Sequence, residues 1–233
     1  MKPAPQYKAF RRAVDVVGAV AVIALLAVLT PFLALAIKLE SPGPVFFGCD
    51  RLGRYGKPFR MLKFRTMAHN APEKFNADGS RLVEQRDARV TRVGAILRAG
   101  FDELPQVFSI LRGNLSFIGP RPDDVFATSM YEGTDWLKLS VKPGLTGLSQ
   151  VSGRNDLPYK ERLRHDAYYA LRRSLWLDAR ILLRTVGVLL GAKSTRRLVS
   201  EEQITAALSE FQAAQDSNAA LRDRFFRPDP DST

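Results

Sequence analysis

Two adjacent carboxylates, Asp102 and Glu103, are the residues of this chain best suited to chemistry. They lie within Phe101-Asp102-Glu103-Leu104-Pro105-Gln106, in a chain whose formal net charge is +11. Carboxylate and phosphate oxygens bind Mg²⁺, and a carboxylate can attack phosphorus to form an acyl phosphate. Basic side chains would stabilise the charge on the phosphate and on the leaving group. The pair therefore suits phosphoryl transfer, although on position alone ordinary charge at a helix N-terminus is the simpler interpretation.

Cationic side chains that could hold a phosphate group occur at three places. Lys63 and Arg65 are two residues apart, which puts both on one face if the segment is extended, and such a pair suits a diphosphate. Arg121 stands between two prolines that fix its backbone, and Arg154 lies in the loop Gly153-Arg154-Asn155-Asp156. Simpler interpretations stay open, namely a solvated basic strand for the first pair and structural pairing for Arg121.

The composition limits the kinds of site that the chain can build. Its 233 residues suffice for one domain and an anchor, and a hydrophobic content of 45% predicts a folded core. The single Cys49 and the widely separated His69 and His165 argue against a disulfide framework and a Cys- or His-rich metal site. The net charge indicates an anionic partner: phosphate groups, nucleic acid or acidic lipid. Chemistry would therefore rest on Asp, Glu, Lys and Arg, with Asp102 as the natural nucleophile.

An apolar run over residues 16–37 carries no charge and is long enough to span a bilayer. Basic residues flank it on both sides, and positive charge prefers the cytoplasmic face. Pro31 removes a helical hydrogen bond, and the Thr30 hydroxyl can satisfy the freed carbonyl. We therefore expect a re-entrant helix that enters the membrane, breaks at Thr30-Pro31 and leaves by the same face. A straight span with the domain outside and a buried core helix are the alternatives.

Periodicity and turn residues predict an α/β fold that is rich in helix and has short strands. Helices are expected at 93–98, 102–111, 159–173, 174–190 and 200–211, and strands at 45–47, 59–64 and within 114–121. Segment 174–190 suits an amphipathic helix in the membrane interface, and a core helix is the alternative. The expected organisation is a membrane helix over 1–40, a catalytic domain over 41–195, and a polar C-terminal tail over 196–233, partly helical or disordered.

Five motifs occur in the order in which a known family has them. They are Ser41-Pro42-Gly43-Pro44-Val45-Phe46-Phe47, Lys63-Phe64-Arg65-Thr66-Met67, Asp102-Glu103-Leu104-Pro105-Gln106, Gly119-Pro120-Arg121-Pro122, and Lys142-Pro143-Gly144-Leu145-Thr146-Gly147 leading to Gln150-Val151-Ser152-Gly153-Arg154. Over about residues 8–192 the chain resembles the bacterial sugar transferases of the monotopic phosphoglycosyl transferase superfamily, which initiate glycan assembly on polyprenol phosphate.

The resemblance implies a role for each candidate residue. Asp102 would attack the phosphate of a UDP-sugar, release UMP and carry the phosphosugar until polyprenol phosphate takes it, while Glu103 would hold Mg²⁺. Asp166 would activate the acceptor or order the site. The cations expected near the phosphates are Lys63, Arg65, Arg98, Arg121 and Arg154. The segment from Arg98 to the carboxylate pair is one residue shorter than the family pattern and lacks its hydroxyl side chains.

The resemblance also implies the partners and the location. The partners would be a UDP-sugar donor, a polyprenol (undecaprenol) phosphate acceptor and membrane lipid, with no nucleic acid, and a homodimer stays open. The catalytic domain would lie on the cytoplasmic face of the bacterial inner membrane. The alternative is a non-catalytic, basic, membrane-anchored protein that binds anionic lipid or nucleic acid. The sequence does not name the sugar.

Overall fold

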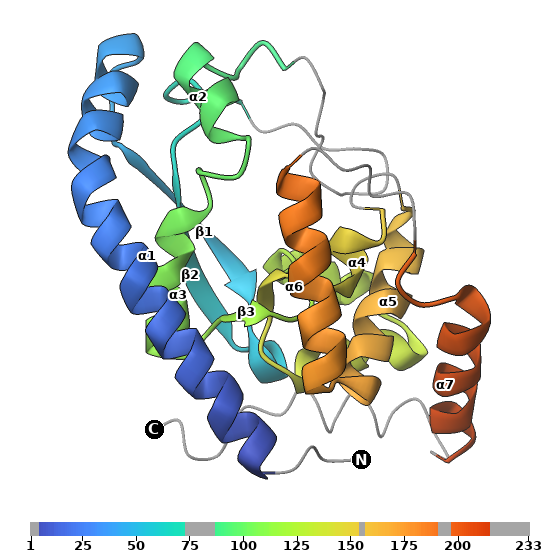
Figure 1. Cartoon of the computed structure of the whole chain (residues 1–233). Coiled ribbons are helices and arrows are strands. Elements are labelled where there is room, and N and C mark those ends of the chain that lie inside the picture. Colours follow the sequence, from blue (N-terminus) through green and yellow to red (C-terminus); the bar gives the residue numbers. More distant parts are fainter. Residues whose placement is uncertain (1–4, 73–86, 154–156, 191–196, 215–233) are drawn as a thin grey trace.

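A long N-terminal helix runs along one side of the molecule, and shorter elements pack against it (Figure 1). The computed structural model describes residues 5–72, 87–153, 157–190 and 197–214. The elements in chain order are α1 (Pro5–Glu40), β1 (Phe46–Leu52), η1 (Arg54–Gly56), β2 (Pro58–Phe64), α2 (Arg92–Leu97), η2 (Leu104–Gln106), α3 (Val107–Arg112), β3 (Ser116–Ile118), η3 (Val125–Met130), η4 (Gly133–Ser140), β4 (Gly144–Thr146), α4 (Leu148–Val151), α5 (Tyr159–Arg172), α6 (Leu175–Leu189) and α7 (Glu201–Ala213).

Helix α1 is long and apolar enough to cross a membrane, judged by length and composition. It runs without interruption through Thr30 and Pro31, so the expected helix-break-helix is not what the structure has. Pro31 removes only the hydrogen bond to the carbonyl four residues before it, and its fixed φ is compatible with helix. The flanking alanines and leucines favour helix on both sides, so the helix continues past the missing bond.

The N-terminal end of α1 is bonded to the rest of the domain. Asp15 is buried and accepts hydrogen bonds from the Ser116 hydroxyl and the Phe117 backbone N–H, both at 3.0 Å. Arg12 donates to the Ile110 carbonyl at 2.7 Å, near the C-terminal end of α3, where a cation complements the helix dipole. Arg11 pairs with an aspartate of α6 at 3.4 Å. These three charged residues before the apolar run thus join α1 to β3, α3 and α6.

The C-terminal end of α1 is bonded to the same domain. The Glu40 carboxylate accepts hydrogen bonds from the backbone N–H groups of Arg92 and Val93, at 2.6 and 2.8 Å. These residues begin α2, so the carboxylate satisfies donors that a helix N-terminus leaves unpaired. A helix of this length extends about 54 Å, and it is held at both ends by one body.

Between its ends, α1 exposes an apolar face along its length. The buried side holds Ala19, Leu26 and Ile37, which join the core formed with the β1–β2 hairpin and α3. Only 11% of its most apolar stretch is buried. The exposed large apolar side chains are Phe10, Val14, Val17, Val20, Leu25, Val28, Phe32, Leu35 and Leu39. Such a long apolar surface is characteristic of contact with lipid or with another protein.

Strands β1 and β2 form an antiparallel hairpin in which Phe46 pairs with Phe64. The hairpin turns at 53–57, where Tyr55 and Gly56 adopt positive φ. Successive side chains of β2 point to opposite faces. Phe64 therefore faces away from Lys63, its neighbour in the chain.

The second half of the chain forms a largely helical layer around α5 and α6. Strand β3 pairs with β4 in parallel, joining segments that the sequence predicted only as a strand and a turn. Leu177 and Ile181 of α6 are buried, whereas Trp176 and Leu183 are 73% and 74% exposed. Helix α6 therefore has one face in the core and one apolar face outside, which combines the two alternatives expected for it.

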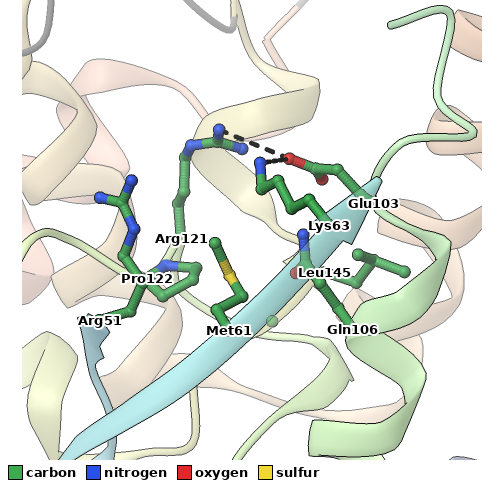
Figure 2. A pocket seen from close by; sticks show the side chains of 9 residues that line it. Arg51, Met61, Lys63, Glu103, Gln106, Arg121, Pro122 and Leu145 are labelled. Carbon is green, nitrogen blue, oxygen red and sulfur yellow. Dashed lines mark hydrogen bonds and ion pairs between the residues drawn. The ribbon is translucent and has the colours of Figure 1, made fainter. Parts of the chain in front are cut away.

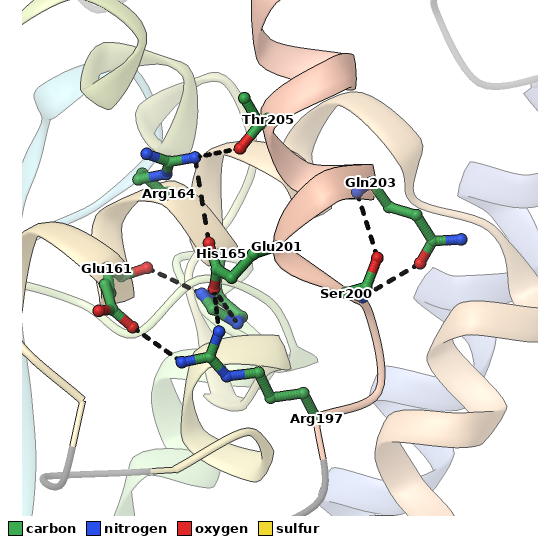
Figure 3. A network of polar contacts seen from close by, with 8 residues as sticks. All are labelled: Glu161, Arg164, His165, Arg197, Ser200, Glu201, Gln203 and Thr205. Carbon is green, nitrogen blue, oxygen red and sulfur yellow. Dashed lines mark hydrogen bonds and ion pairs between the residues drawn. The ribbon is translucent and has the colours of Figure 1, made fainter.

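Helix α7 packs on α5, on the side of the molecule away from α1 (Figure 1). Ile204 is fully buried there, and Arg197 lies between Glu161 and Glu201 at 3.2 and 2.6 Å (Figure 3). Ser200 caps the helix by accepting from a backbone N–H of the first turn. The described part of the expected polar tail is therefore a helix that belongs to the core of this domain.

Candidate active site

A polar pocket lies where β2, the start of η2, the Arg121 turn and β4 meet (Figure 2). Its volume is about 300 Å³, including space open to solvent. The residues that line it are Arg51, Met61, Lys63, Glu103, Gln106, Arg121, Pro122, Gly144 and Leu145. Four of the five sequence motifs contribute to this lining, although they are spread over more than eighty residues of the chain.

Glu103 is the electrostatic centre of the pocket. Its carboxylate pairs with the Lys63 ammonium and lies 3.9 Å from the Arg121 guanidinium. Figure 2 shows both cations directed toward the same carboxylate oxygen. The carboxylate is only partly exposed, so these attractions are screened less than those of a surface pair. Two cations on one carboxylate leave a net positive charge that favours an anionic ligand.

Asp102 precedes this centre and has a different environment. Its backbone N–H donates to the Leu97 carbonyl and its carbonyl accepts from the Phe64 N–H, both at 2.9 Å. Among the described residues, no Lys or Arg nitrogen lies within 4.0 Å of its carboxylate. Burial raises its pKa above the ordinary range, Lys63 and Arg98 act in the opposite direction, and Glu103 adds to the rise. Asp102 is thus a less solvated, unpaired carboxylate beside a paired one.

Three glycines allow the Arg121 turn to approach β4. A side chain at Gly144 would place its Cβ 2.0 Å from the Gly119 backbone nitrogen, and one at Gly147 would lie 2.0 Å from the Gly119 carbonyl oxygen. The Gly144 N–H donates to the Pro120 carbonyl at 2.8 Å. Only glycine permits backbones to come so close. Two motifs distant in the sequence are therefore held together by their lack of side chains, which places Arg121 over the pocket.

The residues after Arg121 anchor its turn in the interior. Asp123 accepts hydrogen bonds from Lys138 at 2.7 Å, Tyr131 at 2.6 Å and Tyr159 at 3.0 Å. Burial would raise the pKa of this carboxyl, but Lys138 and the two hydroxyl donors outweigh it and hold the pKa below the usual value. A satisfied buried carboxylate is costly to disturb. The proline-flanked arginine is thus displayed from a fixed base.

Asp166 belongs to the same interior network and is not a lining residue of the pocket. It lies 3.0 Å from the Lys138 ammonium and accepts from the Ser149 hydroxyl at 2.7 Å. Burial raises its pKa, with Lys138 and Ser149 opposing the rise. Lys138 therefore bridges Asp166 to Asp123, which links α5 to the base of the Arg121 turn. This position fits the ordering role expected of Asp166; activation of an acceptor by it stays a prediction.

The structure does not bring Arg65 into the pocket. Its buried guanidinium donates to the carbonyls of Ser41 and Pro42, each at 2.6 Å, and holds the connection between α1 and β1. Strand β2 ends at Phe64, and the Arg65 backbone N–H still donates to the Val45 carbonyl at 2.9 Å. The two cations separate because their side chains have different partners: Lys63 pairs with Glu103, and Arg65 is held by the two carbonyls.

The other two predicted cations have different outcomes. Arg98 is exposed and donates to the Thr66 hydroxyl at 3.2 Å, and its charge acts on Asp102, although it does not line the pocket. Arg154 lies outside the described residues.

Sequence reasoning missed Arg51 and the interior base of the site. Arg51 lines the pocket and pairs with Asp124 at 2.5 Å. Its only sequence signal was an arginine near the end of an extended segment, which many surfaces share. Asp123 and Lys138 gave no local signal, because they meet only through long-range packing. Gln106, buried at the pocket wall, could have been singled out from its place in the motif of the carboxylate pair.

The donor set in the pocket fits Mg²⁺. This ion takes one or two carboxylates together with substrate phosphates and water. Glu103 supplies a carboxylate directed into the pocket, next to cations that suit a diphosphate. Within the described ranges there is no group of three or more His, Cys, Asp or Glu side chains that could hold a metal. The pocket therefore suits an ion that Glu103 and the phosphate oxygens of a substrate would hold together.

Comparison with known proteins shows the family of the chain. The family model described as "Bacterial sugar transferase" matches residues 6–192. The chain belongs to the bacterial sugar transferase family. The match ends before α7, so the C-terminal helix packed on α5 lies beyond the part that the family model covers.

Several proteins of other bacteria are similar to this chain. A UDP-glucose:undecaprenyl-phosphate glucose-1-phosphate transferase of Caulobacter vibrioides is 43% identical over 193 residues, which cover 77% of this chain and 69% of that protein. The exopolysaccharide production protein ExoY of Sinorhizobium fredii is 38% identical, over 76% of this chain and 83% of that protein. A sugar transferase of Haemophilus influenzae without an assigned role is 40% identical over 77% of this chain. The chain spans about two fifths of the length of that relative and of several others.

The close contact between Gly119 and Gly144 predicts a strong effect of a single methyl group. Gly144→Ala should lower the free energy of unfolding by about 3 kcal/mol, since a Cβ there meets backbone that has no room to move. The control is Gly48→Ala, whose Cβ would meet only the exposed, flexible Arg60 side chain at 2.6 Å. Thermal unfolding of both variants in lipid nanodiscs measures the difference. Equal melting temperatures would contradict this account of the turn.

Proposed function

We propose that the protein transfers a phosphosugar from a UDP-sugar to polyprenol phosphate through a covalent intermediate on Asp102. The observation that carries the proposal is the pairing of unequal carboxylates, with Glu103 neutralised by Lys63 and Arg121 while Asp102 beside it has no cation within ion-pair distance among the described residues. The names of the relatives support the donor and acceptor classes, since the Caulobacter protein is named for UDP-glucose and undecaprenyl phosphate.

In the first half-reaction, a carboxylate oxygen of Asp102 attacks the β-phosphorus of the UDP-sugar. The bond from this phosphorus to the oxygen that bridges the two phosphates breaks, and UMP leaves with that oxygen and its electron pair. Lys63 and Arg121, directed into the pocket, stabilise the charge on the phosphoryl oxygens and on the departing phosphate. The phosphosugar stays on Asp102 as an acyl phosphate.

In the second half-reaction, a phosphate oxygen of polyprenol phosphate attacks the same phosphorus. The bond between phosphorus and the Asp102 oxygen breaks, which regenerates the carboxylate and gives a polyprenyl diphosphate sugar. The cations of the pocket again face the reacting phosphates. A Mg²⁺ ion bound at Glu103 would neutralise part of the diphosphate charge when present.

We further infer that α1 does not cross the inner membrane but lies along its cytoplasmic face as one uninterrupted helix, with both ends on that side. Support comes from Asp15 and Glu40, which bond opposite ends of the helix to the same domain. A straight span would place one end across about 30 Å of hydrocarbon from that domain. The basic residues near both ends also favour one cytoplasmic side. The apolar face between them would then contact lipid.

Asp102→Asn should reduce UMP release from a UDP-sugar by about a thousandfold, because the amide cannot form the acyl phosphate. The matched control is Asp50→Asn, since Asp50 is an exposed residue of β1, and it should retain activity. The assay uses the full chain in lipid nanodiscs with polyprenol phosphate, Mg²⁺ and a panel of UDP-sugars. Undiminished release by Asp102→Asn, or a phosphosugar trapped on another residue, would refute the assignment.

Because Arg98 affects the pKa of Asp102, replacing Arg98 should change how activity depends on pH. The carboxylate form is the nucleophile, so activity falls as pH drops through its pKa. Since the Arg98 charge lowers this pKa, Arg98→Gln should move the acid limb of kcat/KM to higher pH. Activity should drop by about fivefold at the acidic end and change by less than about twofold at the alkaline end. Arg112→Gln, at the end of α3, is the control, and an equal loss at every pH would count against the coupling.

The placement of both ends of α1 on the cytoplasmic face predicts where two cysteines can be labelled. In a Cys49→Ala background, Lys8→Cys lies on the exposed side of α1 before the apolar run, and Arg60→Cys lies on the exposed side of β2. A membrane-impermeant maleimide should label both in inverted inner-membrane vesicles and neither in right-side-out vesicles. Labelling of the two positions from opposite faces would establish a span.

A further inference from the structure

An apolar groove lies against α1, beside the polar pocket. Its volume is about 550 Å³, including space open to solvent, and almost all the surface that lines it is apolar. The lining residues are Ile23, Leu26, Ala27, Thr30, Phe46, Phe64, Pro105 and Phe108. Neither half-reaction involves a residue that lines this groove.

The groove and the polar pocket share their walls. In β2, Lys63 lines the pocket and the next residue, Phe64, lines the groove, because neighbouring side chains of a strand point to opposite faces. In the motif of the carboxylate pair, Glu103 belongs to the pocket and Pro105 to the groove. The Phe64 N–H donates to the Asp102 carbonyl at 2.9 Å, so the nucleophile lies where the two compartments meet.

The groove is also continuous with the apolar outer surface of α1. Ala27 lines it and is exposed, and the next residue, Val28, is 63% exposed on the outer face. Phe46 and Phe108 line it from the domain side and are 40% and 38% exposed. Phe46 stacks on Phe64 with ring centroids 5.2 Å apart. A hydrocarbon chain could therefore pass from lipid into the groove without leaving apolar surroundings.

We propose that this groove binds the first prenyl units of the acceptor while the acceptor phosphate enters the polar pocket. The inference rests on the proposed function and adds to it a binding site for the chain. A sugar or nucleotide does not fit the groove, because its hydroxyls and phosphates would lose hydration against an apolar wall with little to pair with. An amphiphile with an anionic head and a hydrocarbon chain matches both compartments and the wall between them.

Ala27→Trp tests the site by filling it from α1. The expected result is a rise of about tenfold or more in KM for undecaprenyl phosphate, with single-turnover release of UMP from the UDP-sugar, measured without acceptor, kept within about twofold of wild type. Ala24→Trp is the matched control, because Ala24 is an exposed alanine of the same helix outside the groove lining. It should leave both quantities unchanged.

The outcomes separate this inference from the proposed function. An unchanged KM in Ala27→Trp, or an equal rise in both variants, overturns the groove assignment while UMP release still supports the transferase. Geranyl phosphate has only two prenyl units, and these are the units assigned to the groove, so its KM should rise by a similar factor. A rise for undecaprenyl phosphate with no rise for geranyl phosphate would also overturn the assignment. No UMP release by wild type with any UDP-sugar would refute the proposed function itself.

Photolabelling tests the same site in the unmodified protein. A geranylgeranyl phosphate with a diazirine on its first prenyl unit, used with the full chain in nanodiscs, should label groove residues such as Ala27 and Phe108, and undecaprenyl phosphate should compete. Labelling confined to outer residues of α1 such as Val28 and Phe32 would overturn the proposal. The proposal would also be overturned if phospholipid suppressed the labelling and undecaprenyl phosphate did not.

Discussion

The attachment of both ends of α1 to one domain is the constraint on which the rest of the structure depends. Asp15 fixes one end to β3, and Glu40 fixes the other to the start of α2. Asp15 is buried, so breaking its hydrogen bonds would leave polar groups unpaired in the interior, while Glu40 accepts from two backbone N–H groups at the start of α2. The apolar middle must therefore be covered from the side. Helix α1 packs on α3 and on η2, which directly follow the carboxylate pair in the chain. The pair therefore lies close to the lipid or protein that covers α1.

The electrostatics of the site follow from how the cations are used. A net charge of +11 suggested a basic surface that attracts polyanions, but several of the cations are engaged inside the domain. Arg12 caps α3, Arg65 holds the connection after α1, and Lys138 lies buried between two aspartates. Buried, paired cations contribute little to diffuse binding of polyanions. In the part of the chain that the structure describes, the polar pocket brings Lys63 and Arg121 to one carboxylate in a fixed arrangement, which favours an enzyme over a non-catalytic basic anchor.

What the sequence could predict was local, and what it missed was long-range. The hairpin, α2, α5 and the helix after the carboxylate pair followed from periodicity and turn residues, which act over a few positions. The spacing of Lys63 and Arg65 was misleading because the Arg65 guanidinium is held by the carbonyls of Ser41 and Pro42, far from Lys63 in the chain. The parallel pairing of β3 with β4, the bridge that Lys138 makes, and the packing of α7 depend on contacts far apart in the chain. No window of sequence contains both partners of such a contact.

The two carboxylates illustrate why position in the chain does not determine role. Both precede the same short helix, yet Asp102 and Glu103 differ in surroundings because the turn directs their side chains differently. Glu103 meets Lys63 and Arg121, so its charge is neutralised and its oxygens are held. Asp102 is bound through its backbone while burial raises the pKa of its carboxyl. A carboxylate held in place by cations is suited to help bind Mg²⁺. A carboxylate fixed only by its backbone keeps its oxygens available to attack phosphorus. The division of labour that we propose therefore comes from the strand and turns that approach the pair, not from the pair itself.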